Sequence, residues 1–292
     1  MEELFVNTFF NILESNVVSM GLLFIEDTKE IDIIRKVTKR NNLVLCTSND
    51  KIATSCLAMS QKYIRLPEVL ASNQEIIKLY SIIKSISNGM INPDSRIILC
   101  YGEGQYKSTI ELLKPEDDLP VVNAILEIVS ENISSIEVFL STFELALTLA
   151  SARHPYVKGT MITIGDHHNL MLYSRPFMFE PFQYYENKEK CVLNQTIWKT
   201  IERYSRLDAT FILDGNGCIQ SIVDLITPPS IRGEIPQGLG SRHSTAASIS
   251  EQFKSYVIVV SQTSGDVSLF LRGKRILKIK KQNITYNDTF SG

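Results

Sequence analysis

The stretch GLGSRHSTAA, residues 238–247, places two glycines, a hydroxyl, a guanidinium and an imidazole just before a run of good helix formers. Gly240 lets the backbone turn tightly or approach a ligand closely. The following helix would begin with unpaired N–H groups and the positive end of its dipole. Arg242 adds a bidentate donor for phosphate oxygens, and His243 can bind a metal or donate to an oxyanion. The stretch predicts a phosphate site at a helix N-terminus. A capped helix whose Arg242 and His243 face solvent is the alternative.

A second motif stands upstream, in LDATFIL, residues 207–213. Asp208-Ala209-Thr210 together with Gly240-Ser241-Arg242-His243 resembles the paired signature of diadenylate cyclase (DAC) domains, which is Asp-Gly-Ala and then Gly-Thr/Ser-Arg-His. Further matching segments surround the motifs, at residues 159–166, 194–206, 257–261 and 265–268. The resemblance covers nearly the whole chain and is strongest to the archaeal-type cytosolic members. Their N-terminal α/β domain is similar to the C-terminal domain of pyruvate kinase.

Diadenylate cyclases join two ATP molecules into cyclic di-AMP and release two pyrophosphates, because each 3′-hydroxyl attacks the α-phosphate of the other nucleotide. Such chemistry needs a metal ion that neutralises phosphate charge, donors that hold the triphosphate, and a group that favours the 3′-alkoxide. By resemblance, Asp208 lies beside the ribose 3′-hydroxyl, where its carboxylate accepts the proton or holds the metal. The expected catalytic residues are Asp208, Arg242 and His243.

The resemblance also implies which residues bind the ligands. Ser241 and Arg242 fall at phosphate-binding positions, and His243 falls where the family places a metal and phosphate contact. The expected cofactor is Mn²⁺ or Mg²⁺, with His243, Asp208 and Gln262 as its ligands. The expected substrate-binding residues are Ala209, Thr210, Ile226, Gly240, Ser241, Arg242 and Ser244.

Four positions depart from the family pattern. Ala209 replaces a glycine, Thr210 replaces an alanine, and Ser244 stands where a basic residue is common. Gln262 stands where many members carry a metal-contacting glutamate, and a neutral amide is a poorer ligand for a hard cation. The alternative to an enzyme is therefore a degenerate DAC-fold module that binds ATP or cyclic di-AMP with little or no turnover. The intact Asp208 and Arg242 favour the enzyme.

The composition is that of an ordinary globular protein. The chain of 292 residues is 44% hydrophobic and 21% charged, with a formal charge of −2, so bulk charge supports neither a nucleic-acid partner nor a membrane surface. No apolar run reaches the length of a membrane span, and the N-terminus lacks a signal-peptide pattern. The 5 cysteines are scattered, which predicts reduced thiols and a cytoplasmic protein.

Short apolar runs alternate with helical patterns through the N-terminal half. This alternation predicts a small α/β domain with a doubly wound parallel sheet. The expected strands are residues 21–25, 43–46, 63–66 and 96–100, and the expected helices are residues 1–20, 31–40, 51–62 and 75–88. We expect the domain to span residues 1–125, a DAC domain with a mixed sheet flanked by helices to span 126–282, and a polar tail to span 283–292.

The C-terminal half gives fewer clear patterns. The polar, proline-bounded residues 114–120 are a candidate interdomain linker, and long helical periodicity follows. The expected elements are helical residues 121–152, a strand at 159–164, an irregular crossing at 174–185, a helix at 193–206 and a hairpin turn at 214–217.

Two other motifs carry less weight. The stretch YGEGQYKST, residues 101–109, lacks the Walker spacing and predicts a strand-end turn, although an open α/β sheet can bind a regulatory ligand there. Asp166, His167 and His168 have no third spaced metal ligand, so solvated turn residues are expected.

The implied reaction also predicts an assembly. Each active site would hold one ATP, yet the product joins two, so two sites must face each other across a two-fold axis. The expected partners are ATP, cyclic di-AMP and a second copy of the chain in a transient face-to-face dimer. No membrane or nucleic-acid partner is expected.

Overall fold

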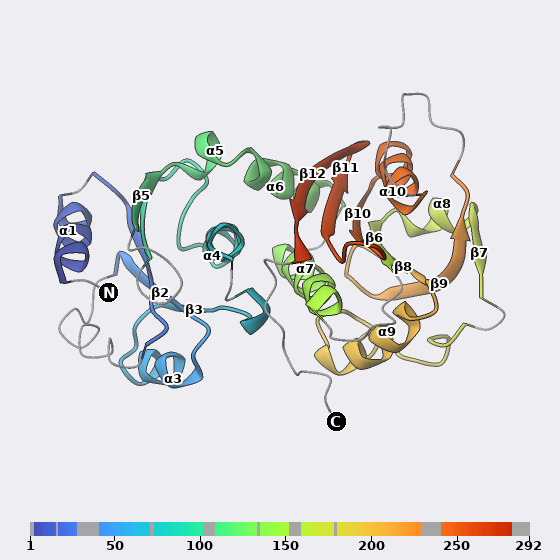
Figure 1. The fold of residues 1–292 in the computed structure, drawn as a ribbon, viewed down its shortest axis with the longest axis horizontal. Coiled ribbons are helices and arrows are strands. Elements are labelled where there is room, and N and C mark those ends of the chain that lie inside the picture. Colours follow the sequence, from blue (N-terminus) through green and yellow to red (C-terminus); the bar gives the residue numbers. More distant parts are fainter. Residues whose placement is uncertain are drawn as a thin grey trace. The chain divides into compact units, whose positions relative to one another are not determined.

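The computed structural model divides the chain into two compact units, Met1–Asn123 and Ala124–Gly292 (Figure 1). Each unit has its own sheet, in agreement with the α/β class expected from the sequence. The residues that the structure describes are 3–15, 17–27, 41–70, 73–101, 109–132, 135–151, 159–177, 180–228 and 241–281.

The N-terminal unit contains a five-stranded sheet in the order β3-β2-β1-β4-β5. The strands are β1 (Met20–Phe24), β2 (Leu43–Thr47), β3 (Tyr63–Arg65), β4 (Ile97–Tyr101) and β5 (Thr109–Leu113). The first four run parallel, and every residue of β1, β2 and β4 is buried, as expected for apolar runs covered on both faces. The edge strand β5 pairs antiparallel with β4 and was not predicted, so the sheet is mixed rather than wholly parallel.

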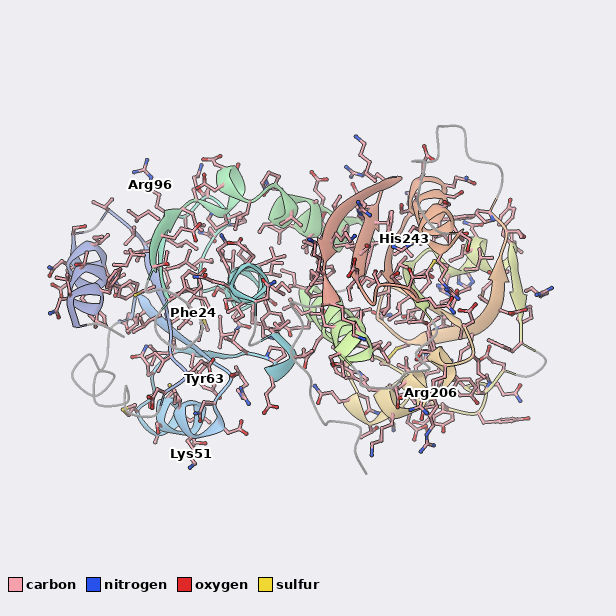
Figure 2. All side chains as sticks on the ribbon, viewed as in Figure 1. Phe24, Lys51, Tyr63, Arg96, Arg206 and His243 are labelled. Atoms are coloured by element: carbon pink, nitrogen blue, oxygen red, sulfur yellow. A yellow bond between two sulfur atoms is a disulfide. The ribbon has the colours of Figure 1, made fainter. Side chains whose placement is uncertain are left out.

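Helices cover both faces of this sheet. Side chains of α1 (Glu3–Glu14) and α3 (Asp50–Ala58) share one apolar core with Leu45 of β2. Helix α4 (Gln74–Ser87) covers the opposite face, and its Ser81 side chain is fully buried. On that face lies Phe24, which is labelled in Figure 2. Its ring stacks on that of Tyr101, with centroids 4.4 Å apart. The unit also holds η2 (Glu68–Leu70) and α5 (Pro115–Asp118).

The C-terminal unit is built on a seven-stranded mixed sheet in the order β12-β11-β10-β6-β8-β9-β7. Its strands are β6 (Thr160–Gly165), β7 (Ser174–Pro176), β8 (Thr210–Leu213), β9 (Ile219–Ile226), β10 (Ser255–Val260), β11 (Val267–Leu271) and β12 (Lys274–Ile279). Strands β6 and β8 are parallel, whereas β10 runs antiparallel to β6. The helical elements here are α7 (Ile136–Ser151), α8 (His167–Met171), η3 (Gln195–Ile197), α9 (Trp198–Ser205) and α10 (Ser241–Gln252), and α6 (Pro120–Asn132) crosses the division between the units.

The two faces of this second sheet are covered by different helices. Because side chains alternate along β10, Val257 and Val259 face α10, and Tyr256 faces α7. Tyr256 lies with its ring centroid 5.6 Å from that of Phe139 on α7. Ala246 of α10 and Leu170 of α8 belong to the same buried cluster as Val257. This packing fixes the N-terminal turn of α10 above the end of β10.

Several local predictions differ from the structure. The helical stretch expected at residues 121–152 is formed by the two helices α6 and α7, and residues 114–120 include the short helix α5. Asp166 caps α8 by accepting a hydrogen bond from the Asn169 main chain, so the expected turn is a helix. The expected irregular crossing at 174–185 begins with β7, which pairs with β9. The expected helix at 31–40 and most of the turn at 101–109 lie outside the described residues.

The expectation of reduced cysteines is wrong for one pair. Cys191 and Cys218 lie opposite each other on an isolated antiparallel bridge and form a disulfide. Cys46, Cys56 and Cys100 are buried and do not take part in a disulfide. Within the described ranges, no single helix has both the length and the apolar composition needed to cross a bilayer.

Candidate active site

The two sequence motifs meet where the central strands β6, β8 and β10 of the C-terminal sheet begin or end. The register pairs Val260 of β10 with Thr160 of β6, and Met161 of β6 with Thr210 of β8. Strands β6 and β8 therefore begin where β10 ends. The residues just before β8 and just after β10 lie side by side at these strand ends, although they are far apart in the sequence.

Asp208 and Arg242 form an ion pair at these strand ends. Asp208 has a left-handed backbone with φ of +69°, a conformation that aspartate tolerates better than most residues. Arg242 lies in the first turn of α10, and its side chain is 20% exposed, compared with 47% for Asp208. Burial lowers the pKa of the Arg242 guanidinium. The carboxylate is thus the accessible partner of this pair.

Gly159 allows the backbone segments around the pair to come close together. A Cβ atom at this position would lie 2.6 Å from the main-chain nitrogen of Gln262 and 2.7 Å from the carbonyl oxygen of Val260. It would also lie 3.0 Å from Nη1 of Arg242. A side chain here would push apart the residues that form the site.

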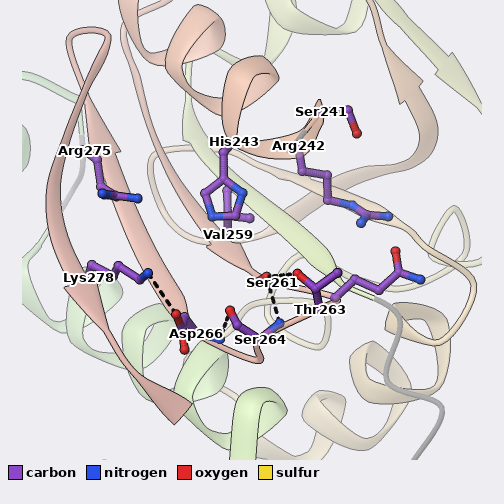
Figure 3. A pocket seen from close by; sticks show the side chains of 11 residues that line it. Ser241, Arg242, His243, Val259, Ser261, Thr263, Ser264, Asp266, Arg275 and Lys278 are labelled. Carbon is purple, nitrogen blue, oxygen red and sulfur yellow. Dashed lines mark hydrogen bonds and ion pairs between the residues drawn. The ribbon is translucent and has the colours of Figure 1, made fainter. Parts of the chain in front are cut away.

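A pocket of about 410 Å³ opens beside the pair, between α10, the β10–β11 turn and β12 (Figure 3). Its volume lies within the range of small-molecule sites. Its lining is almost entirely polar and comprises Ser241, Arg242, His243, Val259, Ser261, Gln262, Thr263, Ser264, Asp266, Arg275 and Lys278.

His243 lies in the middle of the pocket and is partly buried. Its ring meets Phe270 edge to face, with centroids 5.8 Å apart. Burial lowers the pKa of the imidazole below its ordinary value of 6.5, and the charges of Arg275 and Lys278 lower it further. Neutral imidazole is therefore the favoured form near pH 7, and it keeps a lone pair that can bind a metal.

Asp266 is the buried carboxylate of the pocket. Its Oδ2 lies 3.0 Å from Lys278 Nζ, and its Oδ1 accepts a hydrogen bond of 3.1 Å from the Lys281 main chain. Burial alone would raise the pKa of Asp266, but the hydrogen bonds from Lys281, Lys278 and Ser264 outweigh it and lower the pKa below 3.8. The carboxylate is therefore ionised at neutral pH and holds Lys278 in place.

The residues of β12 are the part of the pocket that sequence reasoning missed. Arg275 and Lys278 are three positions apart, a spacing that puts side chains on opposite faces of a regular strand. A register shift between Leu269 and Phe270 leaves Ile276 as an extra residue in β12. The bulge restores Arg275 and Lys278 to the same face, where both line the pocket. In the sequence, only the positive charge of Arg275 and Lys278 could have indicated that they belong to the site.

Comparison with known proteins identifies this unit. Residues 150–275 match the family model described as DAC, the DisA bacterial checkpoint controller nucleotide-binding domain. These residues are a DAC domain. This confirms the family expected from the two motifs.

Two diadenylate cyclases are similar in sequence to the chain that carries this DAC domain. The one from Haloferax volcanii is 31% identical over 143 residues, which are 49% of this chain and 52% of the relative, so the match spans about half of that protein. The one from Methanocaldococcus jannaschii is 23% identical over 279 residues, which are 88% of this chain and 85% of the relative.

The similarities to solved structures are weaker. A double mutant of DacA from Staphylococcus aureus is 18% identical, covers 50% of this chain and 89% of its own, and gives a TM-score of 0.35. A pyruvate kinase from Cryptosporidium parvum is 12% identical, covers 38% of this chain and 22% of its own, and gives a TM-score of 0.33. Scores of this size do not establish a shared fold, and the pyruvate-kinase-like character of the N-terminal domain stays a prediction.

The expected site residues of the DAC domain divide into three groups. Ser241, Arg242, His243 and Gln262 line the pocket, and Asp208 joins them through Arg242. Outside the lining lie Ala209, Thr210 and Ile226, which are buried, and Ser244, which is partly buried. Gly240 lies outside the described residues.

The buried residues Ala209 and Thr210 do not line the pocket of the DAC domain but hold the strands beside it in place. Ala209 is fully buried, and its carbonyl oxygen accepts a hydrogen bond of 2.6 Å from the Thr160 hydroxyl. Thr210 opens β8 in register with Met161. These contacts hold the start of β8 against β6, so the position of Asp208 depends on them.

The side chains at the pocket suit a metal ion that is bound partly by the protein and partly by phosphate oxygens. The His243 imidazole and the Gln262 amide both line the pocket, whereas Asp208 and Asp266 are bound to Arg242 and Lys278. Among the described residues no group of three His, Cys, Asp or Glu side chains could hold a metal. Mg²⁺ and similar cations commonly take substrate phosphates as ligands, so His243 and Gln262 fit a cation that arrives with a nucleotide.

Two other polar groups have structural explanations. The rings of His167 and His168 lie 3.9 Å apart at the start of α8. Asp214 accepts hydrogen bonds from the main chains of Asn216 and Cys218, and Gly217 has φ of +76°. The hairpin turn expected at residues 214–217 is confirmed, and its carboxylate is satisfied within the turn.

Proposed function

We propose that this protein is a diadenylate cyclase that condenses two ATP molecules into cyclic di-AMP and two pyrophosphates. The observation that carries the proposal is the Asp208–Arg242 ion pair beside a polar pocket of about 410 Å³ in a DAC domain. We assign the domain to residues 126–282 and the ATP-binding and reacting groups to the residues at this pocket.

Arg242 and Asp208 act first as a pair and then separately. The phosphates of ATP replace Asp208 as the partner of Arg242, because a guanidinium binds phosphate oxygens through two parallel hydrogen bonds. Ser241, at the start of α10, adds a hydroxyl beside the N–H groups of the first helical turn. The exchange frees the Asp208 carboxylate, which is half-exposed and can reach a ribose.

The reaction then transfers a nucleotidyl group. The 3′-oxygen of one nucleotide bonds to the α-phosphorus of the other, and the proton of the 3′-hydroxyl passes to Asp208 and then to water. The bond between the α-phosphorus and the oxygen bridging to the β-phosphate breaks, and its electron pair leaves with pyrophosphate. Arg242 stabilises the charge that develops on the phosphate oxygens.

A divalent cation, Mn²⁺ or Mg²⁺, belongs to the proposal as a ligand of the ATP phosphates. When bound it would neutralise phosphate charge, and His243 and Gln262 are the residues that would contact it. Because Gln262 is neutral, we infer that the protein alone binds the free metal ion weakly. Metal–ATP rather than the free ion would be the bound species.

The proposal requires two copies of the chain. One pocket has one Asp208 and one Arg242, whereas the product has two new bonds, so two protomers must face each other. Specific activity is then expected to rise with enzyme concentration until the dimer saturates. Since ATP is a cytoplasmic metabolite, we place the protein in the cytoplasm.

The second candidate is a module that binds ATP or cyclic di-AMP without turnover. The observation that favours it is the Gln262 amide at the pocket, since it removes a carboxylate from the donor set. This candidate predicts nucleotide binding without pyrophosphate release.

One assay distinguishes the two candidates. Purified full-length protein is incubated with ATP and Mn²⁺ or Mg²⁺ over a range of enzyme concentrations, and cyclic di-AMP and pyrophosphate are measured. The proposal expects equimolar pyrophosphate per ATP consumed. ATP binding with no cyclic di-AMP at any enzyme concentration would favour the binding module.

A further inference from the structure

The pocket has a pair of cationic side chains opposite the motif residues. Arg275 and Lys278 project from β12 on one side, and Arg242 projects from α10 on the other, with His243 between them (Figure 3). Arg242 and Lys278 are each bound to a carboxylate. Arg275 is exposed and makes no ion pair with any residue that the structure describes. The pocket therefore keeps a positive charge that its own carboxylates do not neutralise.

The bulge in β12 brings the Arg275 and Lys278 side chains to the same face of the strand. Without the extra residue Ile276, only one of Arg275 and Lys278 would face the pocket. The β10–β11 turn adds hydroxyl groups of Ser261, Thr263 and Ser264 to the same wall. A guanidinium, an ammonium and hydroxyl donors form a set that suits phosphate oxygens.

We propose that Arg275 and Lys278, which we call the β12 clamp, bind the β- and γ-phosphates of ATP and hold the pyrophosphate leaving group. The proposal rests on the proposed cyclase reaction, in which Asp208 and Arg242 act on the opposite side of the pocket. When the bond to the α-phosphorus breaks, the electron pair leaves on pyrophosphate. The negative charge therefore grows on the group that faces Arg275 and Lys278, which is where cations are most useful.

The clamp is tested with inorganic tripolyphosphate, which has the charge of the ATP tail without its base or ribose. Binding to the full-length protein is measured by calorimetry with EDTA present, so that only the protein's own cations contribute. Arg275→Gln should weaken tripolyphosphate binding about five- to tenfold, as expected for one partly exposed charge-assisted contact. Adenosine binding should stay the same.

Lys274 provides a matched control on the same strand. Its side chain is exposed and lies outside the pocket lining, so Lys274→Gln makes the same change of net charge without removing a pocket contact. Its tripolyphosphate affinity should remain within about twofold of the wild type, because exposed charges act weakly at a distance. An equal loss in Lys274→Gln and Arg275→Gln would overturn the clamp in favour of general electrostatic attraction.

Lys278 needs a second variant, because it also holds Asp266. Lys278→Gln should weaken tripolyphosphate binding but also leaves a buried carboxylate with fewer partners. Lys278→Arg keeps the ion pair and the phosphate contact, and should restore binding. Thermal unfolding of each variant shows whether the fold is intact.

Pyrophosphate release separates this proposal from the cyclase reaction itself. If wild type forms cyclic di-AMP and Arg275→Gln releases pyrophosphate more slowly at saturating ATP, the clamp holds the leaving group. If wild type cyclises ATP while Arg275→Gln and Lys278→Gln bind tripolyphosphate as tightly as wild type, the clamp is wrong and the cyclase stands. Tripolyphosphate binding that depends on Arg275, without any cyclic di-AMP, would support the phosphate contacts of the clamp but reject both the cyclase and the leaving-group role. No detectable tripolyphosphate binding by wild type would overturn the clamp.

Discussion

The two sides of the pocket carry ion pairs with opposite exposure. On the α10 side the cation is the covered partner, with Arg242 20% exposed and Asp208 47% exposed. On the β12 side the carboxylate is covered, with Asp266 12% exposed and Lys278 43% exposed. The accessible group is thus a carboxylate on one side and a cation on the other. The difference suggests a division of work in which one side accepts a proton and the other binds an anion.

The largest expected effect tests the carboxylate of the α10 side. Asp208→Asn should lower cyclic di-AMP formation by about 100-fold or more, since a lost general base costs that much. The fold should survive, because asparagine also tolerates the left-handed backbone at this position. Turnover and ATP affinity are measured together, and ATP affinity should change only a few-fold.

Asp224 is the matched control for that substitution. It forms an ion pair with Arg175 at the far edge of the same sheet, outside the pocket lining. Asp224→Asn should leave turnover unchanged. Wild-type turnover in Asp208→Asn would refute the assigned role and remove the contrast between the two sides.

The next effect concerns the covered cation of the α10 side. Arg242→Ala should weaken ATP binding about tenfold or more, because a partly desolvated charge-assisted bond contributes about 1.5–3 kcal/mol. Equilibrium binding of ATP and adenosine measures the effect, and adenosine should bind as to wild type. The control is Arg175→Ala, which removes an exposed arginine of the other pair. Equal losses for ATP and adenosine would indicate a folding defect instead.

The covered carboxylate of the β12 side should matter for stability. Asp266→Asn should lower the free energy of unfolding at pH 7 by about 1–2 kcal/mol, as for a hydrogen-bonded charge that loses its partner. The pKa of Asp266 is lowered in the folded protein, so its contribution is present above pH 3.8 and is lost as pH falls through the folded-state pKa. Urea unfolding between pH 7 and 3 should show the gap between wild type and variant closing only at the acid end. A constant gap would contradict the assignment.

The smallest effect concerns the departures from the family pattern. Ala209 is fully buried and is not among the described residues with left-handed backbone, so its Cβ atom causes no strain there. Ala209→Gly with Thr210→Ala should therefore change turnover by about twofold or less and lower stability by about 1–2 kcal/mol. Pyrophosphate release and urea unfolding measure the two effects. A several-fold rise in turnover would show that the natural residues hinder the reaction.

Sequence patterns predicted the central strands better than the edge strands. The apolar runs that form β1, β2 and β4 are wholly buried, so composition alone located them. Most residues of the edge strands β5 and β7 are exposed or only partly buried, and β7 is only three residues long. Their strand state depends on pairing with β4 and β9, a long-range contact with no local pattern.

The sequence by itself determined the α/β class, the hairpin turn after β8, and the two motifs that contain Asp208 and Arg242. These depend on local periodicity, on glycine and aspartate conformations, and on short spacings, all of which are written in neighbouring residues. Only the tertiary structure decided how the site is assembled. The register of β6 against β8 and β10 brings Asp208 to Arg242, and the bulge at Ile276 turns Arg275 and Lys278 to one face. Strand register and bulges follow from packing between distant segments, so no local pattern could reveal the second side of the pocket.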